Sequence, residues 1–477
     1  MTETFEGFPP IGPEPSGAEP LESGAAVGPL PRFVIQEHHA TSLHWDLRFE
    51  RDGVLPSWAI PRGIPPDPRE NHLAVRTEDH PLMYLEFSGE IPAGQYGAGS
   101  MTIWDHGTYE TEKWSDDEVM IVFHGRRVRG RHVLFRTKDN QWMIHRMDPP
   151  EDPTREAMPT GLRPMLATLA PTMPKDQEAY GFEVKWDGIR SIISISGGRV
   201  RIEARTGRDV THRYPELRDL GRAMGATPAV LDGEIVALDP ATGRPSFERM
   251  QRRMHVESES AIRRLRKDVP VVYTIFDLLW LDGHSTMSLP YEERRRLLES
   301  LELRGPSWHT PAYHPGEGSA LLEATRTQGL EGVVAKRLDS VYEPGIRSRC
   351  WLKVKNHLSQ DFVVGGYLPG EGSRARLGAL LLGVYEGDRL AFAGRVGTGF
   401  TESELNRLLK LLEARRRPDS PFEPPPPDKD AIWVNPDLVA EVEFGEWTKG
   451  AGILRHARYK GLRDDREPRE VVREVPA

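Results

Sequence analysis

A lysine followed closely by a glycine is the first candidate for chemistry in this chain. The run Glu183–Arg190 places Lys185 at the end of a predicted strand, with Gly188 just beyond it, where glycine lets the backbone approach a ligand. A neutral lysine amine attacks phosphorus, and burial or neighbouring cations lower the lysine pKa toward that form. The pattern therefore predicts a lysine nucleophile for phosphoryl transfer. A lysine at the edge or surface of a strand is the alternative.

Two further lysines are predicted to share one face of a later strand. Lys353 and Lys355 are two residues apart in the segment Trp351–Lys355, and side chains alternate between the two faces of a strand. Phosphoryl transfer depends mainly on positioning and on cations that stabilise phosphate charge. The two lysines are therefore candidates for binding the phosphates of a nucleotide.

A second candidate site combines two histidines and an aspartate. His38, His44 and Asp46 follow the spacing H-x5-H-x-D, which places His44 and Asp46 on one face of a strand, while His38 returns from the preceding turn. Two imidazoles and a carboxylate suit Mn²⁺, Zn²⁺ or Fe²⁺ and leave positions open for a substrate oxygen. Histidines satisfied within a β-domain are the alternative.

The patterns along the chain predict a multidomain protein that positions these residues. Residues 1–31 are rich in Pro, Gly and Glu and predict a disordered acidic tail. Short aromatic-rich segments over 32–148 predict an all-β, barrel-like domain, and 149–160 form a proline-containing linker. Strand and helix patterns alternate over 161–356, which predicts an α+β domain, and 357–477 predict a small β-barrel with one inserted helix.

Composition narrows the class of protein. The chain has 477 residues, of which 38% are hydrophobic and 28% charged, and its mean hydropathy is −0.53. No apolar run approaches the ~18–20 residues that span a bilayer, and no secretion signal is evident, so we expect a cytoplasmic protein without membrane contact. The single cysteine, Cys350, excludes an intrachain disulfide and a thiolate-rich zinc site.

The formal net charge of −9 counts against a polyanionic partner. However, residues 1–30 contain five glutamates and no basic residue, and residues 419–446 contain eight acidic residues against one lysine. The rest of the chain therefore carries a net charge of +3. Nucleic acid remains a possible partner.

The residues with candidate chemistry belong to an ordered series of six motifs. In chain order the motifs are Lys185–Gly188, Arg205–Gly207, Asp232–Glu234, Phe276–Asp277, Glu331–Lys336 and Trp351–Lys355. The series resembles that of the covalent nucleotidyltransferases, and its local sequence is most similar to the ATP-dependent DNA ligase module of bacterial ligase D. The resemblance covers about residues 161–466.

This resemblance implies a role for each matching residue. Lys185 would attack the α-phosphate of ATP, expel pyrophosphate and hold AMP, with Mg²⁺ as the metal. The nucleotide-binding residues would be Glu183 and Phe276 at the adenine, Arg190 and Arg205 at sugar and phosphates, Glu234 and Glu331 at ribose or metal, and Lys353 and Lys355 at the α-phosphate. Arg463, in the final motif, would orient pyrophosphate from an oligonucleotide-binding barrel that grips the duplex backbone.

The N-terminal part resembles the 3′-phosphoesterase domain of bacterial ligase D over about residues 32–148. The matching segments are Phe33–His38, Leu43–Arg48, Ser57–Gly63, Glu78–Leu82 and Ile91–Gly97. The resemblance implies that His38, His44 and Asp46 hold Mn²⁺, and that His80 contacts the scissile phosphate or assists the leaving group. Arg48, Arg62 and Tyr84 would bind phosphate. His72 departs from the Arg or Lys that the family tends to carry there, which implies weaker stabilisation of phosphate.

Together the two resemblances imply an ATP-dependent DNA ligase with a 3′-end-healing phosphoesterase, acting in double-strand break repair by non-homologous end joining. No polymerase segment is expected, so a separate polymerase and a Ku-like end binder would be partners on DNA. We expect a monomer associated with the nucleoid. Two alternatives stay open: a DNA-end binding adaptor with an inactive esterase, and an RNA ligase of the same superfamily.

Overall fold

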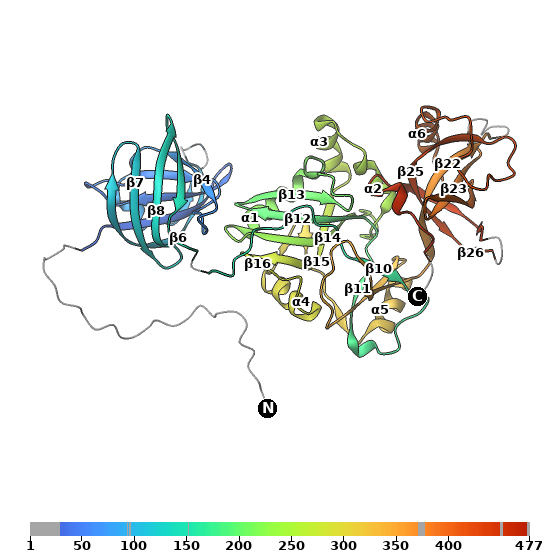
Figure 1. Ribbon diagram of the computed structural model, residues 1–477, viewed down its shortest axis with the longest axis horizontal. Helices are drawn as coiled ribbons and strands as arrows, with labels where there is room; N and C mark the ends of the chain where they lie inside the picture. Colours follow the sequence, from blue (N-terminus) through green and yellow to red (C-terminus); the bar gives the residue numbers. More distant parts are fainter. Residues whose placement is uncertain are drawn as a thin grey trace.

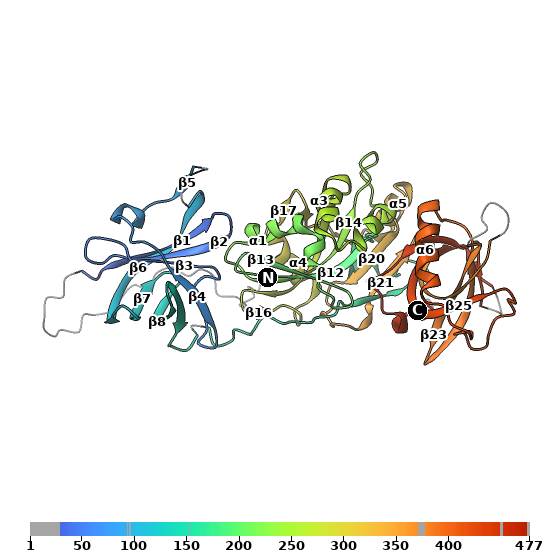
Figure 2. The same cartoon turned by 90° about the horizontal axis from the view of Figure 1, so that it is seen from above.

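The computed structural model describes residues 29–474, except positions 93, 95, 96, 151, 371–376 and 449–451. The predicted acidic tail therefore falls, over residues 1–28, outside the described residues. Three folded units follow one another in a row, with an N-terminal barrel at one end, a larger α+β unit in the middle and a second barrel at the other end (Figures 1 and 2). This arrangement confirms the predicted fold class.

The N-terminal unit is a closed eight-stranded barrel. Its strands are β1 (Arg32–His39), β2 (Leu43–Phe49), β3 (Ser57–Ile60), β4 (Asn71–Arg76), β6 (Gly99–Trp114), β7 (Glu118–Gly125), β8 (Arg129–Lys138) and β9 (Gln141–Arg146). They pair in the order β1-β2-β3-β4-β9-β8-β7-β6, and β6 pairs back with β1. The short strand β5 (Gly89–Ile91) adds to β6, and the 3-10 helix η1 (Leu82–Leu85) precedes it.

Alternation along β2 decides which residues fill this barrel. Leu43, Trp45, Leu47 and Phe49 belong to its aromatic-rich core. Because successive side chains in a strand point to opposite faces, the intervening residues 44, 46 and 48 lie on the outer face. The predicted metal ligands on β2 are therefore on the outside of the barrel wall.

The central unit contains two sheets. The five-stranded sheet has the order β10 (Leu166–Leu169), β21 (Arg347–Lys355), β20 (Gly332–Arg337), β11 (Tyr180–Val184) and β19 (His314–Pro315). The other sheet has the order β13 (Arg199–Ala204), β12 (Ile189–Ser196), β14 (Ala229–Ala237), β15 (Val271–Leu281), β18 (Trp308–His309) and β17 (Arg304–Gly305), and β16 (His284–Ser285) pairs with β15. A buried cluster that includes Ile192, Leu279 and Trp351 joins the two sheets.

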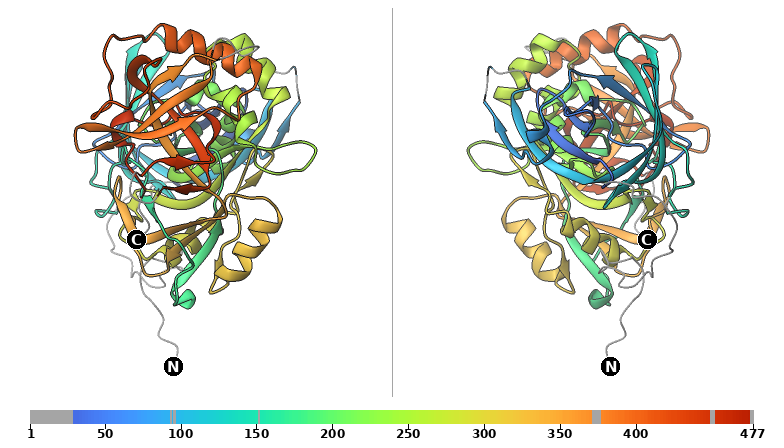
Figure 3. Two further views of the ribbon diagram at one scale, coloured as in Figure 1. Left: turned by 90° about the vertical axis from the view of Figure 1, so that its right-hand side faces the viewer. Right: turned by 90° about the vertical axis from the view of Figure 1, so that its left-hand side faces the viewer.

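The helices of this unit lie around its two sheets, and α2 faces the C-terminal barrel (Figures 1 and 3). They are α1 (Asp219–Met224), α2 (Phe247–Met254), α3 (Glu259–Asp268), α4 (Tyr291–Ser300) and α5 (Gly318–Thr327). Ser246 caps α2 by accepting a hydrogen bond from the Arg249 backbone N–H, and Phe247, Met250 and Met254 form its buried stripe. Helices α1 to α5 lie within residues 161–356, over which the sequence predicts alternating strands and helices. None of the helices in the described ranges is long and apolar enough to cross a membrane.

The C-terminal unit is the predicted small barrel with one inserted helix. Its sheet has the order β24 (Arg389–Val396), β23 (Ala379–Glu386), β22 (Leu358–Leu368), β25 (Ile432–Phe444) and β28 (Arg458–Leu462). The backbone N–H of Tyr459 donates to the carbonyl of Thr398 at 2.9 Å, which brings β28 beside the end of β24. Helix α6 (Glu402–Glu413) follows β24, and β26 (Glu446–Trp447) pairs with β27 (Leu454–Arg455).

Candidate active sites

Neighbouring strands place Lys185 beside a carboxylate and a second lysine. Lys185 follows β11, and its backbone N–H donates to the carbonyl of Gly332 at the start of β20 (2.9 Å). The Lys185 ammonium forms an ion pair with the carboxylate of Glu331. The other oxygen of that carboxylate lies 3.2 Å from Nζ of Lys355, which β21 supplies. Glu331 thus joins two of the predicted motif lysines.

The two lysines of β21 differ electrostatically although they share one face. Burial lowers the pKa of Lys353 to about 8, and its ion pair with Glu474 at 2.5 Å only partly opposes this effect. Burial acts on Lys355 too, but the charges of Glu331 and Glu474 outweigh it and keep the pKa of Lys355 above its usual value. Around neutral pH both lysines are cations that face the Lys185 pocket.

Phe276, the predicted adenine-stacking residue, forms part of the wall of this pocket. Its ring is 6% exposed. The guanidinium of Arg190 lies 4.5 Å from the ring centroid and Nζ of Lys336 lies 4.4 Å from it. Lys336 also lies 4.3 Å from the ring of Trp351. A planar aromatic base would therefore meet Phe276 among cations and other rings.

Glu183 belongs to a buried network of polar side chains near Phe276. Its carboxylate lies 2.9 Å from Nζ of Lys336 and accepts a hydrogen bond from the Tyr291 hydroxyl. Only 3% of the residue is exposed. Its side chain thus holds Lys336 in place. Sequence reasoning missed both partners, although Lys336 closes the Glu331–Lys336 motif.

An ion pair fixes Arg190 at the edge of the same pocket. Its Nε and Nη2 donate to the two carboxylate oxygens of Asp232 at 2.6 and 2.7 Å, and the Tyr342 hydroxyl donates to Asp232 at 2.6 Å. Glu234, opposite Arg190 in the β12–β14 register, also lines the pocket. Burial raises the pKa of Glu234 to about 7, although the charges of Arg190 and Lys185 act against this shift. A bound cation would favour its ionised form.

The remaining two predicted arginines lie at the junction with the C-terminal barrel. Burial, together with the charge of Arg466, lowers the pKa of Arg205 to about 9. Arg463 donates to both oxygens of Asp465 at 2.8 and 2.9 Å and to Glu441 at 2.8 Å. Its Nη2 also donates to the carbonyl of Gly188 at 3.3 Å, directly after the Lys185 motif. Arg463 therefore connects the barrel to the Lys185–Gly188 motif.

Two adjoining cavities meet at Lys185. The smaller one has a volume of about 160 Å³ and is lined by predicted nucleotide-binding residues from every motif. The larger one, about 920 Å³, lies between the central unit and the C-terminal barrel. Besides Lys185, its lining includes the basic residues Arg252, His255, His357, Arg407, Arg458 and Lys460 and the acidic residues Asp187, Glu248, Glu331, Glu404 and Glu443. A polyanion in the larger cavity would thus reach the lysine.

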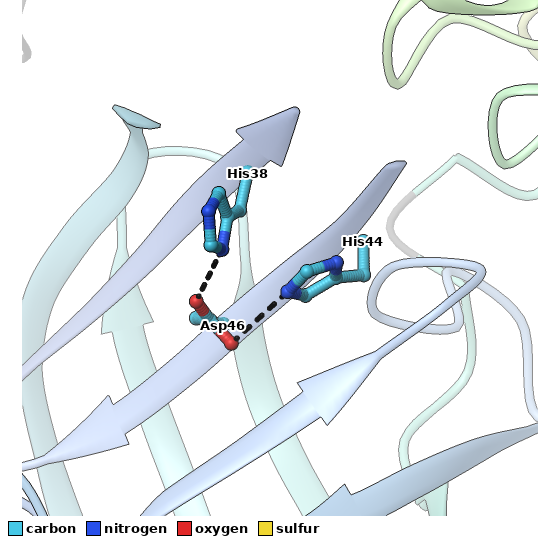
Figure 4. A group of neighbouring side chains, drawn as sticks. All are labelled: His38, His44 and Asp46. Carbon is cyan, nitrogen blue, oxygen red and sulfur yellow. Dashed lines mark hydrogen bonds and ion pairs between the residues drawn. The ribbon is translucent and has the colours of Figure 1, made fainter. Parts of the chain in front are cut away.

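On the N-terminal barrel, His38, His44 and Asp46 come together (Figure 4), although His38 lies in β1, paired with His44 of β2, and not in a turn as the spacing predicts. Their ligand atoms all lie within 4.8 Å of one another. Nε2 of His38 lies 2.8 Å from the carbonyl oxygen of Gly97, and Nδ1 of His44 lies 2.9 Å from that of Ser42. Because a carbonyl oxygen only accepts, these nitrogens carry the protons, and the opposite ring nitrogens face the Asp46 carboxylate.

Arg48 is buried beside this group and orients it. Its guanidinium donates to Gln36 Oε1 at 2.8 Å, to Ser57 Oγ at 3.1 Å and to Asp46 Oδ2 at 3.0 Å. Burial opposes the charged form of Asp46, but the positive charge of Arg48 helps to keep the Asp46 pKa below its usual value. The sequence singles out Arg48 as a phosphate ligand but does not identify Gln36 or Ser57 as its partners.

His80 and Tyr84 lie next to the Arg48 guanidinium. Their ring centroids are 5.2 Å apart, and the Arg48 guanidinium carbon lies 5.3 Å from the centroid of Tyr84. Burial, followed by the charge of Arg48, lowers the pKa of His80 below its usual value. A neutral imidazole is therefore the resting form of His80 at neutral pH, while its neighbour Arg48 supplies positive charge.

Arg62 and His72 both lie beside Glu70. Nδ1 of His72 lies 2.6 Å from the carbonyl oxygen of Gly63, and Nε2 lies 3.2 Å from Glu70. His72 is 4% exposed. Arg62 lies 4.0 Å from Glu70 and packs near Gly197 of the central unit. The contacts of both residues are thus with Glu70 and neighbouring backbone.

Three family models match successive parts of the chain. The DNA ligase D 3′-phosphoesterase domain matches residues 36–136, the ATP-dependent DNA ligase domain matches residues 164–355, and the ATP-dependent DNA ligase C-terminal region matches residues 373–466. These matches fall on the N-terminal barrel, the central unit and the C-terminal barrel in that order.

Relatives with all three parts extend the similarity over nearly the whole chain. The multifunctional non-homologous end joining protein LigD of Mycobacterium bovis is 44% identical over 96% of this chain and 59% of its own length. The protein of the same name from Pseudomonas aeruginosa is 36% identical over 98% of this chain and 60% of its own length. A solved structure of mycobacterial DNA ligase D complexed with ATP and MES is 42% identical, covers 66% of this chain and 98% of that chain, and gives a TM-score of 0.49. The chain thus spans about three fifths of the curated relatives.

Proposed function

The chain belongs to the ligase D family, and from that premise we propose that it is an ATP-dependent DNA ligase with a 3′-end-healing phosphoesterase for non-homologous end joining. The observation that carries the proposal is the pocket in which Lys185 meets Glu331, Lys353 and Lys355. A protein that only binds DNA ends needs no lysine held among phosphate-binding cations. The adaptor alternative is therefore disfavoured.

The first step would be transfer of AMP to Lys185. Its neutral Nζ attacks the α-phosphorus of ATP, a nitrogen–phosphorus bond forms, the bond to the β-phosphate oxygen breaks, and pyrophosphate leaves. Lys353 and Lys355 stabilise the charge that develops on the α-phosphate. Glu234 and Glu331 would hold Mg²⁺, which neutralises phosphate charge when bound, and the raised pKa of the buried Glu234 fits a carboxyl group that a cation would ionise.

The esterase site would use a divalent cation, for which we propose Mn²⁺. The fit rests on two imidazoles whose second nitrogens are anchored to backbone carbonyls and on one carboxylate between them. When bound, the metal would polarise a phosphoryl oxygen of the 3′ end. Arg48 would keep Asp46 oriented, and His80 and Tyr84 would contact the scissile phosphate or the leaving group.

The two sites serve one DNA end. Sealing requires a free 3′-hydroxyl, which a 3′-phosphate blocks, so the esterase would prepare the end that the ligase joins. A Ku-like end binder and a polymerase on the same break are the proposed partners of a monomer at the nucleoid. The RNA-ligase alternative does not account for the esterase barrel.

Labelling with ATP that carries radioactive α-phosphate tests the lysine assignment. Wild type should become labelled after treatment with pyrophosphate to remove any AMP already bound, and peptide mapping should place AMP on Lys185. Lys185→Ala should show only background label, whereas Lys175→Ala, at an exposed lysine, should label as wild type does. Equal labelling of wild type and Lys185→Ala would refute the assignment.

A further inference from the structure

The chain segment Val471–Glu474 reaches the nucleotide pocket from the C-terminal barrel. The Glu474 carboxylate lies 2.5 Å from Nζ of Lys353, and the two side chains are only 19% and 13% exposed. Burial opposes ionisation of Glu474, but the charges of Lys353 and Lys355 hold its pKa at about 2. The ionised carboxylate of Glu474 thus occupies the position beside Lys353, the lysine assigned to the α-phosphate.

The barrel holds this carboxylate in place through contacts along the whole segment. Val471 is buried in the barrel core. Gln360 accepts from the Glu474 backbone N–H and donates to the Val472 carbonyl, both at 3.0 Å. The Arg473 guanidinium lies 4.1 Å from the ring centroid of Trp447. Glu474 is therefore presented by a fixed backbone.

A second carboxylate, at the end of the 3-10 helix Pro468–Glu470 that precedes this segment, makes a similar contact. Glu470, four residues earlier, lies 3.6 Å from Arg205 and 3.8 Å from Arg163. Arg205 is the predicted sugar- and phosphate-binding arginine. Glu470 is about half exposed, so its contribution is screened by solvent more strongly than that of Glu474.

The small volume of the pocket around Lys185 agrees with a phosphate-binding position that Glu474 already occupies. The pocket around Lys185 has about 160 Å³, and Glu474 forms part of its wall. Small-molecule sites usually have about 300–1,000 Å³. Withdrawal of Glu474 would enlarge the pocket on the side of the motif lysines and free Lys353.

We propose that Glu474 is an internal competitor of the nucleotide phosphates. In the free enzyme its carboxylate neutralises Lys353, and it has to leave before the α-phosphate of ATP makes the same contact. The nucleotide and Glu474 therefore exclude each other at one cation, which lowers the apparent affinity for ATP by the fraction of molecules in which the carboxylate is withdrawn. The inference rests on the proposed function because it assigns Lys353 to nucleotide binding.

Glu474→Gln tests this competition because it keeps the shape of the side chain and removes its charge. The rate of lysyl-AMP formation is measured against ATP concentration after removal of bound AMP with pyrophosphate. The KM for ATP should fall at least about five-fold, as expected if Glu474 closes the site in about four fifths of molecules, with kcat within about two-fold of wild type. Glu467→Gln, at an exposed glutamate of the same region, should leave both values unchanged.

Glu474→Asp keeps the charge but shortens its reach, so its KM should lie between those of wild type and Glu474→Gln. It also supplies the comparison if Glu474→Gln does not fold. An unchanged or higher KM in the folded Gln variant would overturn the proposal, as would a lower kcat with unchanged KM, which indicates a structural role. Absence of labelling in wild type would instead refute the ligase function, so the two failures are distinguishable.

Discussion

Lys353 and Lys355 show how strongly local surroundings separate two residues of one type. They share a strand face, yet burial lowers the pKa of Lys353 to about 8, whereas Glu331 and Glu474 keep that of Lys355 above its usual value. The spacing in the sequence predicts the shared face. It does not predict the difference, because the partner carboxylates belong to Glu331, directly before β20, and to Glu474, the last described residue of the chain.

This difference predicts a pH dependence of nucleotide binding. Since the lowered pKa of Lys353 is about 8, its positive charge is present below that pH and is lost as the pH rises through it. The KM for ATP in lysyl-AMP formation should therefore rise above pH 8, approaching about tenfold per pH unit. Lys353→Arg should flatten this profile because arginine keeps its charge throughout. A parallel rise of the KM in wild type and in Lys353→Arg would contradict the assignment of this pH dependence to Lys353.

Other residue roles follow from partners that are distant in sequence. Glu183 is identified from its motif, but its contacts with Lys336 and Tyr291 depend on how β11, β20 and α4 pack. Similarly, Gln36 and Ser57 hold Arg48 from two neighbouring strands. A sequence pattern names the residue that reacts or binds, whereas the residues that orient it become visible only through tertiary contacts.

At the scale of elements, the close pairing of β20 with β21 is what brings Glu331 and Lys355 together. Gly332, at the start of β20, has φ +145°, and a Cβ there would lie 2.1 Å from the carbonyl oxygen of Val354. Only glycine allows the two strands to approach in this way. The pairing of β20 with β21 therefore depends on Gly332, a residue of the predicted Glu331–Lys336 motif.

Gly332→Ala should accordingly destabilise the central unit by about 1–3 kcal/mol and lower lysyl-AMP formation by displacing Lys355. Urea unfolding and the labelling assay measure the two effects. Gly243→Ala is the matched control, because that glycine also has a positive φ of +68° but a Cβ there meets nothing within 4 Å. Equal stability of the two variants would show that the close approach is unimportant.

The sequence predicts the type of most elements better than their pairing. Alternation and aromatic content indicate strands across the N-terminal barrel, and apolar spacing indicates α4, α5 and α6. Closure of the barrel through β1 and β6 is not visible in any local pattern, because it joins strands about 70 residues apart. The same holds for β10, which pairs in parallel with β21.

At the scale of the whole molecule, the net charge of −9 does not describe the cleft between the central unit and the C-terminal barrel, whose lining combines basic and acidic side chains. Polar contacts join these two units: Gln251 donates to the Lys460 carbonyl at 2.7 Å, and Arg213 lies 3.0 Å from Asp464. At the other end, Leu43 of the esterase barrel lies against Gly198 of the central unit. The two proposed sites are thus carried by units that contact each other within one chain.

Sealing of a nick with a 3′-phosphate tests most directly that one chain both heals and joins DNA ends. With ATP, Mg²⁺ and Mn²⁺, wild type should convert such a nick to continuous strand, and Lys185→Ala should accumulate the 3′-hydroxyl form. His44→Ala should seal a 3′-hydroxyl nick normally but lose sealing of the 3′-phosphate nick by at least about 10–100-fold, the loss that follows even when a supporting partner of a metal ligand is removed. His124→Ala, at an exposed histidine of the same barrel, should match wild type. Sealing of the 3′-phosphate nick by His44→Ala at the wild-type rate would contradict the account.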